Sequence, residues 1–323
     1  MKVLGINATI TNIGSGHAFA NCAILILVFS TAATFADEQT NLASYPTPAE
    51  LMRRVVQNEV KAANDDEARL SFRGVKTTPK GSATKLYVET RQATADEVIA
   101  YDGKPLNQQQ RQAEEARIER FINNPVELKK KCDQDHETAE RTLRILRALP
   151  DAFLFEYAGE QAGSDAIGRV GARLLKFNFR PKTTYQPPSR LEEVLTGLQG
   201  FVLIDAEQYR LASIDATLFK DVAFGWGILG HLNRGGRFVL QQENITDDLW
   251  QASSMTLDFT GKVLFMKTIN VRSTEVFSDF HRVPTELTFI QTLEMMKHQG
   301  SLLAANWIAF NLAPKEIMRQ RSK

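Results

Sequence analysis

The sequence predicts an α+β protein: a large curved antiparallel sheet, in the form of an incomplete β-barrel, covered by helices. Two observations predict the sheet. Short runs between residues 173 and 283 alternate apolar and polar side chains, and turn signals separate these runs roughly every ten residues. A third observation predicts the cover, because segments with helical spacing of apolar residues stand before and after the strands.

The first 36 residues have the composition of a secretory signal peptide. Lys2 is the only charged residue before Asp37, and residues 18–35 are apolar or small almost throughout. A short apolar core that ends in small residues is typical of a cleaved signal, so we expect cleavage near Ala36 and a periplasmic or secreted protein. An uncleaved N-terminal anchor helix is the alternative.

The composition after the signal segment excludes some classes of function. Removing residues 1–36 takes away one of the 39 basic residues and none of the 38 acidic ones, so the charges balance. A balanced charge gives no bulk attraction to nucleic acid. Cys132 is the only cysteine that remains, which excludes an intramolecular disulfide. We expect residues 37–300 to form a single half-barrel domain held by apolar burial.

The part of the chain before residue 105 predicts a helix and then a hairpin. In the segment TPAELMRRVVQNEVKAAND, Thr47 can cap the helix, Pro48 suits its first position and Glu50 completes a capping box. Apolar residues then recur on one helical face. The next segment, ARLSFRGVKTTPKGSATKLYVET, has two alternating runs around a Pro-Lys-Gly turn, which favours a β-hairpin.

Residues 105–148 predict a charged helical insert. Charge is dense there, and leucine and isoleucine recur at helical spacing near the end. Because Asn124-Pro125 interrupts the pattern, we expect two helices, the second running to about Ala148. This insert is the candidate surface for an envelope protein partner.

The strand-like region predicts an antiparallel meander with one apolar, aromatic-rich face. In RLLKFNFRP, Leu175, Phe177 and Phe179 fall on one face and polar residues on the other. We expect turns throughout the region, among them one at Thr260-Gly261 and one at 272–274.

The C-terminal part predicts a helix and an apolar tail. In VPTELTFIQTLEMMKHQG, Leu287, Ile290, Leu293 and Met296 share one helical side. Residues 301–323 are an apolar segment followed by basic residues, which predicts either a last helix packed on the sheet or peripheral contact with an anionic membrane surface.

The segment GWGILG, at residues 225–230, matches the glycine pattern of dinucleotide-binding loops. Such a loop needs a buried strand before it and a helix that opens at the last glycine. The run before it alternates, and Gly235-Gly236 follows too soon for a helix of two turns. We therefore expect the glycines to let the chain bend, with Trp226 at the mouth of a cavity.

Cys132 and His136 stand one helical turn apart and could ligate a metal or form a thiolate–imidazole pair. A structural zinc site needs four ligands, and the other histidines are scattered singly. The sequence also lacks a G-x-S-x-G elbow. We expect no metal, no cofactor and no catalytic residue, and therefore a protein that is not an enzyme. A cleft that gathered Asp279, His281 and Cys132 would favour the enzyme alternative.

The segment GFVLIDAEQYRLASIDATLF has an Ile-Asp pair at a strand end, then a turn and a returning strand. Phe201, Ile204-Asp205 and Leu211 resemble the W-I-D-x-x-x-x-L strand turn of the periplasmic lipoprotein-sorting and carrier superfamily (LolA/LolB/RseB-like). The organisation is similar in outline over about 47–95 and 150–283. The resemblance implies a half-barrel closed by helices around an apolar cavity for acyl chains, and the charged insert has no counterpart in it.

We therefore expect an exported envelope protein that binds or carries a lipid, an acyl chain or a lipidated protein. The alternative is an envelope sensor or interaction module that binds a protein partner through residues 105–148. Each acyl methylene removed from water contributes about 0.8 kcal/mol, so an apolar cavity can hold a chain without polar anchors. The residues expected to line the cavity are apolar members of the strands and the bend: Phe177, Phe179, Phe201, Leu203, Trp226, Phe238, Met255, Leu257 and Phe259.

Overall fold

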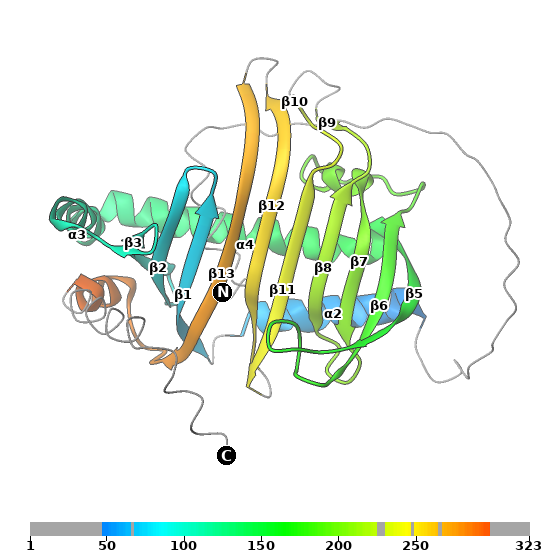
Figure 1. Cartoon of the computed structure of the whole chain (residues 1–323), viewed down its shortest axis with the longest axis horizontal. Coiled ribbons are helices and arrows are strands. Elements are labelled where there is room, and N and C mark those ends of the chain that lie inside the picture. The colour runs from blue at the N-terminus through cyan, green and yellow to red at the C-terminus, as the bar shows by residue number, and fades with distance from the viewer. Residues whose placement is uncertain (1–46, 66–67, 225–229, 247–248, 264–266, 298–323) are drawn as a thin grey trace, which may run out of the picture. The chain divides into compact units, whose positions relative to one another are not determined.

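The computed structural model describes residues 47–65, 68–224, 230–246, 249–263 and 267–297 (Figure 1). The expected signal segment and the expected C-terminal tail therefore lie outside the described residues. The chain divides into two compact units. Unit 1 consists of Met1–Asp65 and Glu137–Val276, and unit 2 of Asp66–His136 and Phe277–Lys323. No helix within the described ranges is both long enough and apolar enough to cross a membrane.

Thirteen strands form one antiparallel sheet, which confirms the predicted α+β class. Their order is β4-β3-β2-β1-β13-β12-β11-β8-β7-β6-β5, with β9 and β10 off this path, so the described strands do not close into a barrel. The strands are β1 Arg69–Thr78, β2 Gly81–Glu89, β3 Thr94–Tyr101, β4 Lys104–Pro105, β5 Phe153–Ala162, β6 Arg173–Pro181, β7 Leu198–Asp205, β8 Leu211–Leu218, β9 Val222–Phe224, β10 Gly230–Leu232, β11 Arg237–Thr246, β12 Leu249–Val263 and β13 Lys267–Val283.

Two of the predicted turns are wrong, because β12 and β13 are longer than the turn signals indicated. β12 runs through Thr260-Gly261 and β13 runs through residues 272–274. Gly261 serves a different purpose: a Cβ atom there would lie 2.2 Å from the carbonyl oxygen of His231. The glycine therefore allows close approach of β10, its partner strand, and does not mark a turn.

In unit 1, helices pack on one face of the sheet. The capping box predicted for α2 (Pro48–Ala63) is present, since the backbone N–H of Thr47 donates to Glu50 at 2.9 Å and the N–H of Glu50 donates back to the Thr47 hydroxyl at 3.3 Å. The apolar side of α2 and the second half of α4 (Pro125–Ala152) share one buried cluster with β5 to β8. A short 3-10 helix, η1 (Glu192–Gly197), contributes to the same cluster. The buried residues of this cluster include Leu51, Val55, Leu143, Phe153, Phe177, Phe179, Val202 and Ala216.

In unit 2, β1 to β3 pair as antiparallel neighbours, and β1 and β2 form the predicted hairpin. The predicted helical insert corresponds to α3 (Gln108–Asn123) and α4, which are separated at Asn124 as expected. A smaller cluster joins β2, β3, α3 and the helical residues 289–297. The described helical residues 289–297 bury Leu293 and Met296 as predicted, but the third buried apolar residue among them is Phe289, because Leu287 precedes the first helical turn.

Candidate functional site

Six of the nine residues expected to line a cavity lie on the face of unit 1 that contacts α2 and α4. Residues directly opposite each other in neighbouring strands point to the same face of a sheet. Ala216, in the helix-packed cluster, lies opposite Phe238, which in turn lies opposite Leu257. The same register assigns to this face Phe177, Phe179, Met255 and Phe259, in addition to Phe238 and Leu257.

Phe201 and Leu203 lie on the other face, so the nine residues do not line one cavity. Leu203 belongs to a separate small cluster with Leu174, Ala212 and Trp250, and the Lys176 amine lies 4.4 Å from the centroid of the Phe201 ring. Their alternation with Val202 and Ile204 along β7 explains the placement. Trp226 lies outside the described residues.

Burial on the helix-facing side changes from one strand to another. Phe177 and Phe179 on β6 are 5% and 4% exposed, and both belong to the core. On β11, β12 and β13, Leu240 and Met255 are buried, but four other apolar residues of this face are only half-buried. We call them the apolar stripe: Phe238, Leu257, Phe259 and Val271, in which Phe238 lies opposite Leu257 and Phe259 opposite Val271. Aromatic and aliphatic side chains that share one face and keep part of their surface accessible can contact an apolar ligand.

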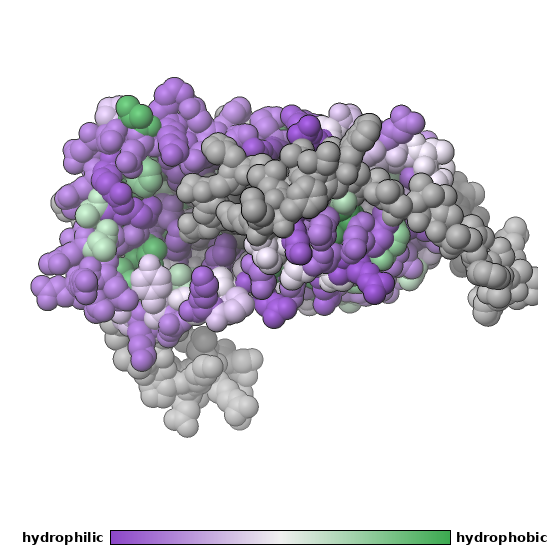
Figure 2. Space-filling view, turned by 90° about the horizontal axis from the view of Figure 1, so that it is seen from above, coloured by the Kyte–Doolittle hydropathy of each residue, from purple (hydrophilic) through white to green (hydrophobic). Residues whose placement is uncertain are grey.

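The opposite face of the same strands is polar. Arg237 on β11 forms two bonds to Asp215 on β8, at 3.0 and 2.6 Å, and Arg272 on β13 donates to Asp258 on β12 at 3.1 Å. Such cross-strand pairs are typical of a solvated sheet face. Seen from above, as in Figure 2, the surface of the molecule is mostly hydrophilic, with a few separate hydrophobic patches. The alternation predicted for the meander is confirmed at the cross-strand pairs named above, but Trp250 on β12 joins Leu203 in an apolar cluster on this opposite face.

The strand turn that carries the family resemblance is held by two ion pairs. Asp205 is fully buried and accepts two bonds from Arg169, at 2.8 and 3.0 Å, and the backbone N–H groups of Glu207 and Gln208. Burial opposes ionisation of Asp205, but these bonds outweigh it and hold the pKa of its carboxyl below the usual range. The two backbone contacts lie within the turn and Arg169 comes from the connection between β5 and β6, so together they hold the turn in its conformation.

The second ion pair connects this turn to α2. Glu59, on α2, is fully buried and accepts bonds from Arg210 at 2.7 and 3.1 Å and from the N–H of Leu211 at 2.9 Å. The pair fixes the helix to the turn between β7 and β8 by a charged contact inside the core.

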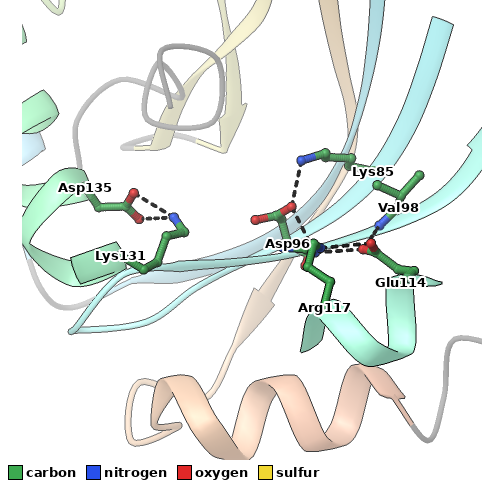
Figure 3. A network of polar contacts seen from close by, with 7 residues as sticks. All are labelled: Lys85, Asp96, Val98, Glu114, Arg117, Lys131 and Asp135. Carbon is green, nitrogen blue, oxygen red and sulfur yellow. Dashed lines mark hydrogen bonds and ion pairs between the residues drawn. The ribbon is translucent and has the colours of Figure 1, made fainter. Parts of the chain in front are cut away.

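In unit 2, side chains of α3 bond to the outer edge of β3 (Figure 3), and a side chain of α4 bonds to the same edge. Glu114 accepts the backbone N–H of Val98 at 2.7 Å, and Nη2 of Arg117 donates to the carbonyl oxygen of Asp96 at 2.6 Å. Asp135 on α4 accepts the N–H of Thr94 at 3.1 Å. Residues 94, 96 and 98 alternate along the strand, so these three backbone groups point away from β2. Charged side chains thus satisfy the edge that a neighbouring strand would otherwise pair with.

The carboxylates at this edge differ in how well neighbouring groups stabilise their negative charge. Asp96 is partly buried, which opposes ionisation, yet Lys85 at 2.7 Å and Arg117 at 3.3 Å hold the pKa of its carboxyl below the usual range. Burial, followed by the like charge of Glu114, raises the pKa of Glu97 to about 7. The Oε2 atom of Glu97 is buried without a hydrogen-bond partner. Glu97 is therefore the least stabilised carboxylate among these residues.

Cys132 and His136 do not form a reactive pair. Cys132 packs partly buried against the core of unit 2, and burial raises the pKa of its thiol, which disfavours the nucleophilic thiolate. His136 is exposed. No group of three or more potential metal ligands occurs within the described ranges. Asp279 forms an ion pair with Arg73.

At the glycine segment, Gly230 begins a short strand, β10, which pairs with β9 and β12. A strand at this position contradicts the helix that a dinucleotide loop requires and supports the interpretation of the glycines as a bend. Residues 225–229 lie outside the described part of the chain.

Sequence reasoning missed the edge residues Glu114, Arg117 and Asp135, because a charged helix face normally contacts solvent. The spacing of Glu114 and Arg117, three residues apart, was the available signal, since it places both on one side of a helix. That spacing alone does not tell whether the pair contacts water or another part of the protein.

A scan against protein-family models finds no match for this chain, and a search of curated proteins finds none either. Among solved structures, the chain is similar to the crystal structure of a DUF1329 family protein from Desulfovibrio piger ATCC 29098. The match has 10% sequence identity and a TM-score of 0.24, and it covers 74% of this chain and 93% of that chain. A likeness at this TM-score supports no conclusion about function.

Proposed function

We propose that this chain is an exported, non-catalytic envelope protein that binds an acyl chain of a lipid or of a lipidated protein. The single observation that carries the proposal is the apolar stripe, whose four side chains remain half-buried on the side of unit 1 that α2 and α4 cover. The resemblance of residues 201–211 to the lipoprotein-carrier turn and the expected signal segment point to the same class of function.

Apolar contact along the stripe supplies enough free energy for such a ligand. Each buried methylene contributes about 0.8 kcal/mol, so ten methylenes would give a gross gain of about 8 kcal/mol before the cost of ordering the chain. Leu240 and Met255 on the same face are 3% and 2% exposed, so they fill the space beside the stripe. The ligand contacts that we propose are therefore Phe238, Leu257, Phe259 and Val271.

The first test is to isolate residues 37–323 from a periplasmic expression and to extract the protein for lipid mass spectrometry. Stoichiometric co-purifying lipid or acyl peptide is the expected result and identifies the ligand class. A ligand-free protein that also fails to bind a fluorescent fatty acid would overturn the proposal.

Variants locate the ligand on the stripe. Leu257→Asn places an amide among the apolar side chains and should weaken fatty-acid binding about tenfold, the equivalent of 1.4 kcal/mol. Leu257→Met keeps the surface apolar and should bind like the wild type. Val239→Thr is the matched control on the opposite face, since Val239 neighbours Phe238 on β11. Equal affinities for Leu257→Asn and Val239→Thr would place the ligand elsewhere.

A further inference from the structure

The geometry at β3 points to a second site, independent of acyl binding. We propose that the outer edge of β3, at residues 94–98, is a docking edge for an extended, basic segment of a partner protein, and that α3 is a displaceable guard over it. Three features of unit 2 support this proposal: how the guard is attached, how its ends are built, and which charges it covers.

The guard is attached mainly by charged side chains. Ile118 is the one residue of the described helix α3 that is fully buried, with Phe121 and Ile122 partly buried against the same cluster. Glu114 and Arg117 make side-chain hydrogen bonds from α3 to β3. A helix with so little apolar burial opens at a lower free energy than the rest of its unit.

Both ends of α3 adjoin positions where the chain can change direction, at the loss of only the two-residue pairing of β4 with β3. Gly103 precedes the helix in a turn with a φ of 71°, a conformation that glycine adopts at little cost. Asn124 follows the helix in an extended conformation, at φ −123° and ψ 95°, before α4 begins. Rotation at these two positions would move α3 away while β3 stays paired with β2 through residues 94–98.

The charges beneath the guard specify the chemistry of the partner. Asp96 and Glu97 both lie on β3, and Arg117 is the guanidinium that α3 presents to them. A strand added to this edge would supply backbone partners for Asp96 and Val98, the groups that α3 releases, while Asp135 on α4 keeps the N–H of Thr94. An arginine or lysine in that strand would replace the charge of Arg117. The partner segment is therefore extended and basic.

The position of Glu97 makes the guard sensitive to pH. Its strongest charged neighbours are all on α3: Glu114 and Glu115 repel its charge, and Arg117 and Arg111 attract it. When α3 moves away, its pKa should fall from about 7 towards its ordinary 4.5. The closed form then binds the proton more tightly than the open form, so opening becomes more favourable as the pH rises from 4.5 to 7.

Amide hydrogen exchange measures the opening directly. Expressed as a protection factor, which corrects for the intrinsic exchange rate, protection of the Val98 amide should fall on the order of 20-fold between pH 5.5 and 7.5. Glu97→Gln should abolish this change at Val98. Protection at Phe72 and Tyr87, within the β1–β2 hairpin, should not follow it. If the Val98 amide exchanges only together with these hairpin amides, α3 does not open on its own and the proposed guard is wrong.

Removing one guard contact should open the edge. Glu114→Ala deletes the acceptor of Val98 and the main partner of Arg117, and should lower the Val98 protection factor at least tenfold. Glu119→Ala is the matched control on the same helix, because Glu119 is half-exposed and pairs with Lys297. Glu97→Gln tests the proposal if Glu114→Ala fails to fold. It should stabilise the closed form above pH 7 and therefore raise the Val98 protection factor there.

Peptides test the docking itself. The probe is a blocked eight-residue peptide of alternating arginine and valine, and its control replaces arginine with glutamate. The arginine peptide should bind Glu114→Ala at least tenfold more tightly than Glu119→Ala, and it should restore protection at Val98. Equal affinity for the two variants, equal binding of the two peptides, or protection elsewhere would each overturn the docking edge.

Discussion

Helices α2 and α3 each contain 16 residues and each begins with a capping box, yet they are attached to their units by different chemistry. α2 buries five apolar residues and one glutamate against its sheet, whereas in the described helix α3 the buried residue is Ile118 alone. Glu114 and Arg117 of α3 bond instead to the backbone of β3. The comparison shows that a helix can cover a sheet face by apolar burial or a sheet edge by charged side chains.

The two helices differ in the kind of surface that becomes exposed when each one detaches. Loss of α2 would expose the apolar core of unit 1, which couples its stability to that of the whole unit. Loss of α3 would expose polar backbone and carboxylates that water can solvate, together with the smaller apolar cluster of unit 2 around Ile118. We therefore expect substitutions in α2 to change global stability and substitutions in α3 to change local opening.

The largest effect is expected at the buried ion pair between Glu59 of α2 and Arg210. Glu59→Ala leaves Arg210 buried without its partner and removes the acceptor of the Leu211 N–H. Because an unpaired buried charge is costly, the free energy of unfolding should fall by about 3–5 kcal/mol. Chemical denaturation monitored by circular dichroism measures the change.

Glu59→Gln serves as the control for this prediction. It keeps an acceptor for Leu211 but loses the charge, so it should cost less than alanine. A loss below about 1 kcal/mol for Glu59→Ala would mean that α2 depends on apolar burial alone.

The sequence predicted α2 almost completely and α3 only as a helix. The apolar residues of α2 recur at helical spacing because one continuous side of the helix packs on a sheet face. The capping box of α2 is encoded in neighbouring residues. The contacts of α3 join residues such as Glu114 and Val98 that are distant along the chain and chemically ordinary. No local pattern encodes such a pairing.

The same distinction explains the outcome at the candidate sites. Alternation predicted that Phe177 and Phe179 share a buried face, but Phe201 and Leu203 were assigned to that face without knowledge of the strand register. A one-residue shift in register moves a side chain to the opposite face. The edge strand β5 was not predicted, because its pattern, FLFEYAGEQA, is interrupted by a bulge between Tyr157 and Glu160.

A matched pair of apolar truncations sharpens the comparison between the helices. Leu51 on α2 and Ile118 on α3 are 2% and 0% exposed. Leu51→Ala should lower the global free energy of unfolding by about 2–5 kcal/mol, as expected for a filled core. Ile118→Ala should have a smaller global effect and should mainly lower the protection of Val98 in hydrogen exchange. Equal global losses would show that α3 unfolds together with its unit.

The smallest effects are expected at the two caps, which are alike in geometry. Thr47 accepts the N–H of Glu50 at 3.3 Å, and Asn107 accepts the N–H of Gln110 at 2.9 Å. Either residue replaced by alanine should weaken its helix by about 1 kcal/mol. In Thr47→Ala this loss should appear in global unfolding, since α2 belongs to the core of unit 1. In Asn107→Ala it should appear as a roughly fivefold lower protection factor at Val98, with the global midpoint unchanged, since α3 opens on its own. If both variants shifted the global midpoint equally, the difference in attachment would have no consequence for stability.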